Sequence, residues 1–210
     1  SNWQRLWMSS WLYFYHSDKT LMTYHYDSNH DYHQPHLGLD QLTIELGTHE
    51  AMKLCCNFIP KLPIKQDSVD SYPILTPAHF NISKIYHNFF LEIVCETFLL
   101  GTTFYPTEKI WRPMINMTPF MVVGPKNYLA NLKKLGFKTF STWWDEGYDE
   151  DADLDNGKES IRCIQRNCNQ ISKLSLPQLK SLYNDMLPVL QHNQQRFSEL
   201  TNQEFDKIWP

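Results

Sequence analysis

Short apolar runs alternate along the chain with stretches that have helical spacing. Residues 89–94 form an apolar run rich in β-branched and aromatic side chains, which predicts a buried strand. Residues 120–123 form a second run of this kind. Between them, Thr107 offers a hydroxyl directly before charged residues, which is typical of a helix start, and Pro119 predicts the end of that helix. We therefore expect residues 90–124 to run strand, loop, helix, strand.

The first third of the chain predicts mainly helical structure and one long connection. The pattern indicates a helix over residues 3–15, a strand over 20–26, a polar loop over 27–38 and partly helical structure over 39–58. Residues 59–77 hold four prolines and few periodic apolar positions. We interpret them as a Pro-rich surface loop whose length suggests a functional loop or an insertion.

The last third predicts a short helix, a turn region and a pair of helices. The short helix covers residues 128–135, and Gly136 closes it at the C-cap position. A short strand or extended segment over 137–140 and a turn over 142–148 follow. Residues 158–202 are expected to hold two helices, over 158–171 and 176–200, with the second bent or broken near Pro188.

Strands that alternate with helices predict an α/β fold. We expect a Rossmann-like, mostly parallel sheet flanked by helices, with a C-terminal helical pair, in one domain over residues 1–210. Only four strands are predicted with clear patterns, which is fewer than a full doubly wound sheet has. Two alternatives follow: further strands lie in the Pro-rich region, or the domain is reduced.

Composition indicates a globular protein. The chain has 210 residues, of which 42% are apolar and 14% aromatic, enough to fill one sizeable core. The net charge of −4 gives no broad electrostatic reason to bind nucleic acid. Eight carboxylates lie between Asp145 and Glu159 against one lysine, and we interpret residues 145–157 as a solvated acidic loop.

Cysteine and histidine usage bears on compartment and metal binding. The five cysteines form no CxxC pair, which favours free thiols in a reducing, cytoplasmic compartment. No apolar run is long enough to span a membrane. The histidines between His16 and His36 lie mostly in a predicted loop without nearby cysteine, so we expect no metal site and no bound cofactor.

The start of the central helix carries the sharpest candidate chemistry. A helix N-terminus offers free N–H groups and partial positive charge, and Lys109 and Arg112 add cations suited to a diphosphate. Glu108 could accept hydrogen bonds from ribose or sugar hydroxyls. The competing interpretation is a capped helix, begun by Thr107, whose Glu108 and Arg112 pair on the surface. Glu96, at the expected C-terminal end of a strand, either faces a ligand or caps a loop.

The run CETFLLGTTFYPTEKIWRPMINMTPFMVVG resembles the donor-binding motif of α1,3-fucosyltransferases. In that family a Phe-Glu-Asn-like element, a loop, Thr-Glu-Lys and a Pro-led apolar strand ending in Gly follow one another. The resemblance places Glu96 on the motif glutamate and residues 107–109 on Thr-Glu-Lys. Ser1-Asn2 followed by Arg5 is similar to the Ser-Asn…Arg element, whose arginine contacts the donor diphosphate. LKKLGFKTFSTWWDEGYDED is similar to glycosyltransferase-like proteins of large viruses and phages.

The resemblance implies a donor-binding lobe of a GT-B type glycosyltransferase. Its substrates would be a GDP- or UDP-linked sugar and a glycan or protein acceptor, in viral or host cytoplasm. Substrate-binding residues would be Arg5, Glu96, Thr107, Glu108, Lys109 and Arg112. Thr97 replaces the family's asparagine, which puts guanosine and fucose specificity in doubt. The family's catalytic base belongs to an N-terminal acceptor lobe, so no base is assigned here.

Three functions therefore stay open. The first is a glycosyltransferase donor domain. The second is a binding or structural module that keeps the fold without turnover. The third is an α/β protein of unrelated chemistry whose Thr-Glu-Lys match is accidental.

Overall fold

The computed structural model describes residues 3–24, 35–64, 66, 84–101, 103–150 and 154–200. Internal contacts divide the chain into two compact units, Ser1–Lys84 and Ile85–Pro210, each of which is described by itself. The prediction of one domain over residues 1–210 stays a prediction. Within the described residues no helix is long and apolar enough to cross a bilayer.

The first unit is helical. It contains α1 (Trp3–His16), the 3₁₀ turn η1 (Ser17–Lys19), α2 (Pro35–Leu46), α3 (Thr48–Cys55) and a second 3₁₀ turn, η3 (Ile59–Lys61). The three α-helices pack on one another. Leu6, Leu42 and Leu54 from these helices are fully buried in its core, together with Phe58 between α3 and η3.

Two predictions for this unit are wrong in part. Residues 20–23 form no strand, and Tyr24 makes only an isolated antiparallel bridge with Ile64. The predicted loop over 27–38 contains the first turn of α2, which begins at Pro35 because proline is favoured where a helix needs no N–H donor. Residues 25–34 and 67–83, including most of the Pro-rich loop, lie outside the described residues.

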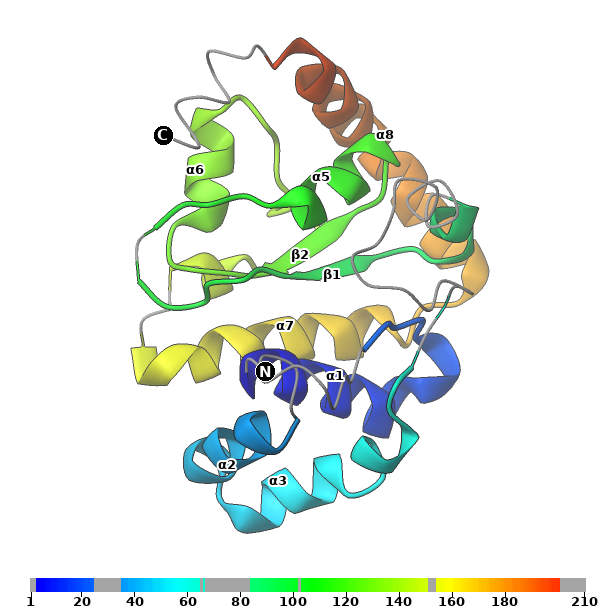
Figure 1. Ribbon diagram of the computed structural model, residues 1–210. Helices are drawn as coiled ribbons and strands as arrows, with labels where there is room; N and C mark the ends of the chain where they lie inside the picture. The colour runs from blue at the N-terminus through cyan, green and yellow to red at the C-terminus, as the bar shows by residue number, and fades with distance from the viewer. Residues whose placement is uncertain are drawn as a thin grey trace. The chain divides into compact units, whose positions relative to one another are not determined.

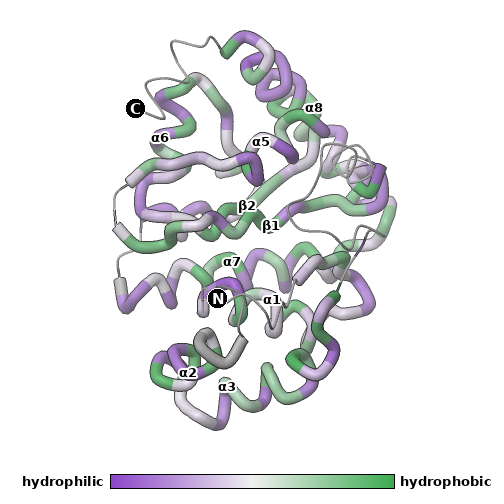
Figure 2. The backbone as a smooth tube through the Cα atoms, in the orientation of Figure 1, coloured by the Kyte–Doolittle hydropathy of each residue, from purple (hydrophilic) through white to green (hydrophobic). Residues whose placement is uncertain are grey.

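The second unit is built on a parallel pair of strands. Its elements are η4 (Tyr86–Asn88), β1 (Glu92–Cys95), α5 (Glu108–Ile115), β2 (Phe120–Val123), α6 (Tyr128–Lys134), η5 (Gly147–Asp149), η6 (Leu154–Gly157), α7 (Lys158–Ile171) and α8 (Leu176–Glu199). β1 pairs with β2 in register, Glu92 opposite Phe120 and Cys95 opposite Val123. β2 is hydrophobic and buried throughout (Figure 2).

Helices cover this strand pair. α5 contacts β1, α7 contacts β2, and Figure 1 shows these two helices on opposite sides of the strands. The predicted α/β class with a parallel strand pair and two C-terminal helices is therefore confirmed. The larger predicted sheet is not seen, because the described residues contain a sheet of two strands and residues 137–140 belong to no strand.

The long C-terminal helix is continuous. α8 runs through Pro188 without the predicted break. A proline removes the bond to the carbonyl four residues earlier, here that of Asn184, and both residues are exposed, so water can hydrate that carbonyl.

α8 also supplies partners to the ends of other elements. The Asn193 side chain bonds both the N–H and the C=O of Lys138, at 2.8 and 2.9 Å. Gln194 Nε2 donates to the Ile115 carbonyl at the end of α5, and Arg196 Nε donates to the Leu135 carbonyl at the end of α6. α8 therefore satisfies backbone groups that the shorter helices leave without partners.

Candidate functional site

The predicted helix start is confirmed as α5. Thr107 is its N-cap in extended conformation, and its Oγ1 accepts a hydrogen bond from the Lys109 backbone N–H at 3.4 Å. The helix ends at Ile115, four residues before Pro119. Lys109 Nζ also reaches back to Thr107 Oγ1 at 3.2 Å. A full positive charge therefore lies at a helix end that already carries partial positive charge.

Glu108 lies beside this cation. Its carboxylate is 3.5 Å from Lys109 Nζ, and its side chain is 60% exposed. Burial alone would raise the pKa of Glu108, but the charges of Lys109 and Arg112 and a backbone hydrogen bond outweigh it, so the pKa is lowered. Glu108 is thus an ionised, accessible acceptor next to the ammonium of Lys109, whose side chain is 28% exposed.

Glu96 is buried behind α5. Only 3% of it is exposed, and its carboxylate accepts three hydrogen bonds. Thr107 gives two of them, from its backbone N–H at 3.3 Å and from its hydroxyl at 2.7 Å. Tyr128 on α6 gives the third, from its hydroxyl at 2.6 Å. The loop-capping interpretation of Glu96 agrees with this geometry, since its bonds join the two ends of the loop between β1 and α5.

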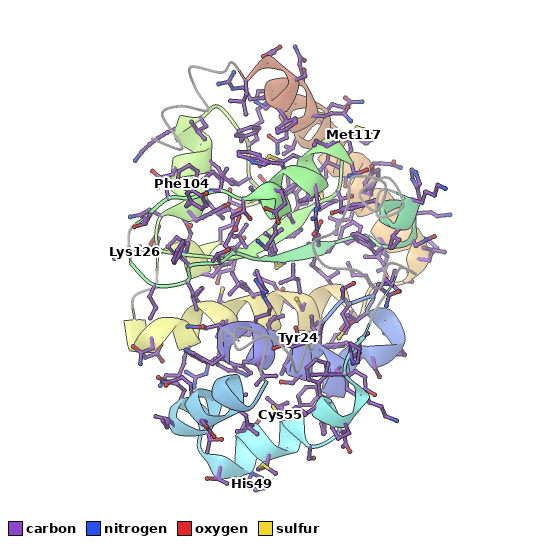
Figure 3. All side chains as sticks on the ribbon, viewed as in Figure 1. Tyr24, His49, Cys55, Phe104, Met117 and Lys126 are labelled. Atoms are coloured by element: carbon purple, nitrogen blue, oxygen red, sulfur yellow. The ribbon has the colours of Figure 1, made fainter. Side chains whose placement is uncertain are left out.

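The loop that Glu96 closes is anchored at some positions and exposed at others. Leu99 is buried, and the Phe104 ring, labelled in Figure 3, packs edge-on against Tyr128 at 5.2 Å between centroids. Phe98 and Tyr105 are about half exposed. Compact loops with joined ends are frequently functional, and Tyr105 lies two residues before Thr107.

Arg112 lies one helical turn after Glu108, but its charge also acts on a second carboxylate, Glu92. The Tyr86 hydroxyl donates to Glu92 Oε2 at 2.7 Å. Burial raises the pKa of Glu92 to about 7, although Tyr86 and Arg112 both oppose the rise. Among the described ion pairs, Glu108 pairs with Lys109 rather than with Arg112. The charge of Arg112 therefore acts on two acidic groups, Glu92 and Glu108.

Arg5 lies in α1, in the first unit, whereas the other predicted site residues lie in the second. The structure describes the two units separately, so the role predicted for Arg5 is not tested. The second unit brings Glu96, Thr107, Glu108 and Lys109 together directly.

The acidic run differs from the predicted solvated loop. Asp149 is 9% exposed, and its carboxylate accepts the N–H groups of Leu129 and Ala130 at 2.7 and 3.1 Å. It therefore stabilises the start of α6 from a distant part of the chain. Glu146 accepts the Phe140 N–H at 2.6 Å, and burial raises its pKa. The run is thus partly a set of structural acceptors.

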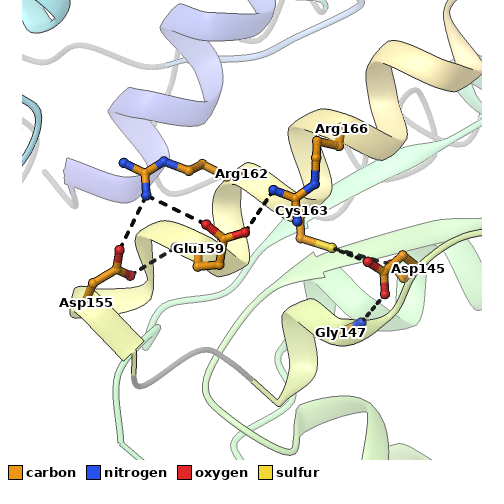
Figure 4. A network of polar contacts seen from close by, with 7 residues as sticks. All are labelled: Asp145, Gly147, Asp155, Glu159, Arg162, Cys163 and Arg166. Carbon is orange, nitrogen blue, oxygen red and sulfur yellow. Dashed lines mark hydrogen bonds and ion pairs between the residues drawn. The ribbon is translucent and has the colours of Figure 1, made fainter.

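Asp145 has the same structural character (Figure 4). Its carboxylate accepts the Gly147 N–H at 2.8 Å and lies 3.4 Å from Cys163 Sγ. The Gly147 N–H and the thiol lower the pKa of Asp145, whereas burial raises the pKa of Cys163 to about 11. Such a thiol stays protonated at neutral pH, so Cys163 is a packing residue rather than a nucleophile.

The rest of Figure 4 is a surface ion-pair network on α7. Arg162 lies 3.4 Å from Asp155 and 3.7 Å from Glu159, and Arg166 lies 2.8 Å from Glu159. All four side chains are more than a third exposed. Exposed pairs of this kind stabilise a protein by about 0–1 kcal/mol each, so the network mainly makes that face of α7 polar.

A pocket of about 530 Å³ opens beside α6. It lies apart from Thr107 and Lys109, and two of its carboxylates, Glu146 and Asp149, already hold backbone amides. Its lining residues are Asn127, Leu129, Ala130, Lys133, Ser141, Trp144, Asp145, Glu146, Gly147, Asp149 and Glu150. We assign no ligand to it.

Two residues of this region escaped the sequence analysis. Tyr128 is the first residue of the predicted short helix and shows no local sign of its bond to a residue 32 positions earlier. The one available signal was general: a tyrosine that begins a buried helix needs a partner for its hydroxyl. Glu92 could have been singled out as a charge inside an apolar strand.

The expectation of no metal site stays a prediction. The described residues contain no group of three or more His, Cys, Asp or Glu side chains placed to hold a metal ion. His25, His30 and His33 lie outside those residues. All five cysteines are free thiols, of which Cys55, Cys163 and Cys168 are buried.

Comparison of the chain with models of protein families, with curated proteins and with solved structures finds no match. The similarity to α1,3-fucosyltransferases therefore rests on the motif residues alone and stays a prediction.

Proposed function

We propose that the second unit binds a nucleoside-diphosphate sugar and serves as the donor domain of a glycosyltransferase. The observation that carries the proposal is the group at the start of α5. An ammonium, Lys109, lies beside an exposed, ionised carboxylate, Glu108, at a helix N-terminus. The cation and the helix N-terminus can bind the negative charge of a diphosphate, and the carboxylate can accept hydrogen bonds from ribose or sugar hydroxyls.

The same group suits the chemistry of glycosyl transfer. Negative charge grows on the diphosphate as the bond to the sugar breaks, and a fixed cation stabilises that charge without rearranging. Arg112, one turn further along α5, adds a planar cation to the same helix. The proposal includes a Rossmann-like sheet, a cytoplasmic location and a separate acceptor lobe that carries the catalytic base.

A non-catalytic binding module is the second candidate. One observation favours it: the buried carboxylate of Glu96 is held by three hydrogen-bond donors, so it is not free to accept a proton from an acceptor hydroxyl. Glu108 remains as an accessible carboxylate, but the proposal gives it a hydroxyl-binding role. Donor binding without turnover would distinguish this candidate from a transferase.

Nucleotide binding tests both candidates. Thermal unfolding would be followed with GDP, UDP and their sugars at concentrations up to millimolar. A ligand at a hundred times its Kd stabilises the folded state by about 2.7 kcal/mol, which is roughly 5–10 °C in Tm for a chain of this size. The absence of any shift at millimolar nucleotide would refute donor binding.

Substitution of Lys109 tests the residue assignment. We expect Lys109→Ala to weaken nucleotide binding by roughly 10- to 100-fold, because one charge-assisted contact to phosphate is lost. Lys134→Ala is the matched control, since Lys134 is an exposed lysine on α6 that bonds Asn131. Equal affinities in the two variants would show that the diphosphate binds elsewhere. Donor hydrolysis or transfer assays would then separate an enzyme from a binding module.

A further inference from the structure

Tyr128, Glu96, Thr107 and Lys109 form a continuous chain of hydrogen bonds. Tyr128 Oη donates to Glu96 Oε1 at 2.6 Å, and Thr107 Oγ1 donates to Glu96 Oε2 at 2.7 Å. Lys109 Nζ then donates to Thr107 Oγ1 at 3.2 Å. The chain joins α6 to the partly exposed Lys109 at the start of α5, 19 positions earlier in the sequence.

The direction of each bond in this chain is determined. A tyrosine hydroxyl and a threonine hydroxyl each carry one proton, and an ionised carboxylate only accepts. Burial and the neighbouring Glu96 raise the pKa of Tyr128, so its hydroxyl keeps its proton and donates. The Thr107 hydroxyl uses its one hydrogen to donate to Glu96. The lone pairs of the same oxygen then accept from the backbone N–H and the ammonium of Lys109.

Burial makes the inner part of the chain rigid. Tyr128 is 1% exposed, Glu96 3% and Thr107 8%, whereas the side chain of Lys109 reaches solvent. A carboxylate with three donors has little freedom to rotate, because a buried acceptor that loses a donor is costly. The Lys109 ammonium, on a side chain that reaches solvent, is therefore held by groups that are buried.

We propose that Tyr128 is a positioning residue for Lys109, acting through Glu96 and the Thr107 hydroxyl. The effect of this positioning on ligand binding rests on the proposed function, since a positioned ammonium is useful only where an anion binds. It assigns a role to a residue outside the Thr-Glu-Lys block, and it makes Glu96 a support of the site rather than a ligand contact.

The test compares two tyrosines and two substitutions of Thr107. Tyr128→Phe removes one hydroxyl and keeps the ring that packs on Phe104. Tyr148→Phe is the control, because Tyr148 is equally buried and its hydroxyl is not part of the chain. Thr107→Val breaks the chain at its centre, and Thr107→Ser keeps the hydroxyl and should restore wild-type behaviour. If Tyr128→Phe does not fold, the comparison of Thr107→Val with Thr107→Ser tests the hydrogen-bond chain in its place.

The first measurement is the mobility of the Lys109 side chain without ligand. It is obtained from ¹³C relaxation of the lysine Cε in isotope-labelled protein, with the signal assigned by Lys109→Arg. We expect the order parameter to fall in Tyr128→Phe and Thr107→Val and to stay unchanged in Tyr148→Phe and Thr107→Ser. An unchanged order parameter in folded Tyr128→Phe would overturn the proposal, whatever the protein binds.

The second measurement is the affinity for GDP by calorimetry. We expect roughly tenfold weaker binding in Tyr128→Phe, which corresponds to about 1.4 kcal/mol. If wild-type protein binds neither GDP nor UDP but Lys109 still becomes mobile in Tyr128→Phe, donor binding is wrong and the positioning role stands. If wild-type protein binds GDP and Tyr128→Phe binds it equally well, the positioning role is wrong and donor binding stands.

Discussion

Glu92→Gln is expected to make the protein more stable above neutral pH and to flatten the pH dependence of its stability. Glu92 is a partly buried carboxylate at the start of β1, held by the Tyr86 hydroxyl at 2.7 Å. Burial raises its pKa from an ordinary 4.5 to about 7. Between pH 4.5 and 7 the Glu92 carboxyl therefore keeps its proton in the folded protein and has lost it in the unfolded chain.

The sign and size of the effect follow from this difference. Because the folded state binds more protons, the free energy of unfolding falls as pH rises from 4.5 through 7 and then levels off. Each unit of difference in pKa corresponds to 1.36 kcal/mol. The ionisation of Glu92 therefore lowers the free energy of unfolding by about 3 kcal/mol at pH 8 relative to pH 4. A glutamine can still accept the Tyr86 hydroxyl hydrogen bond and carries no charge to desolvate.

The assay is urea unfolding of wild type and Glu92→Gln at a series of pH values from 4.5 to 8.5. Other groups titrate alike in both proteins, so the difference between the two curves isolates Glu92. The difference should grow in favour of Glu92→Gln as pH rises, reaching about 2–3 kcal/mol. Tyr86→Phe removes a bond that favours the charged form of Glu92, so in that variant stability should keep falling to higher pH and the total loss should be larger. A difference that stays constant with pH would refute this reasoning.

Two further substitutions test how α8 and the turn after α6 are held. Asn193→Ala should lower the free energy of unfolding by about 1–3 kcal/mol in urea denaturation, because it removes two part-buried hydrogen bonds between the buried Asn193 side chain and the backbone of Lys138. Gly136→Ala should cost more in the same assay than Gly101→Ala. Both glycines have φ near +90°, but a Cβ at Gly136 would lie 2.9 Å from Arg196 Nε, whereas one at Gly101 would meet nothing within 4 Å. Equal losses for the two alanines would mean that backbone strain alone, and not the contact with Arg196, limits this turn.

Local signals in the sequence predicted the core of the second unit well. Thr107 before Glu108 gave the start of α5 because capping depends on residues next to one another. The apolar runs predicted β1 and β2. Gly136, whose φ is +89°, predicted the end of α6. The strand predicted over 20–26 is wrong for its described residues, 20–24, because alternation alone does not supply a partner strand, and among these residues only Tyr24 forms a bridge, with Ile64.

Features that depend on distant residues were not predicted. Asp149 appeared to be part of a solvated acidic run, yet it stabilises the start of α6 about 20 residues earlier in the chain. Tyr128 meets Glu96 across 32 residues. Both are side chains whose role is set by tertiary packing rather than by their neighbours in sequence. The candidate site was therefore predictable in its exposed part, Glu108 and Lys109, and not in the buried groups behind it.

The bonds between α8 and α5 also bear on the order in which the protein can be completed during synthesis. The end of α5 obtains two of its partners from α8: Tyr183 bonds the Met117 carbonyl across 66 residues, and Gln194 bonds the Ile115 carbonyl across 79 residues. At roughly 5–20 residues per second, the ribosome needs at least several seconds to make this intervening chain. During that interval α5 exists without the contacts that fix its far end, so a nascent chain can complete the packing of this helix only after α8 has been made.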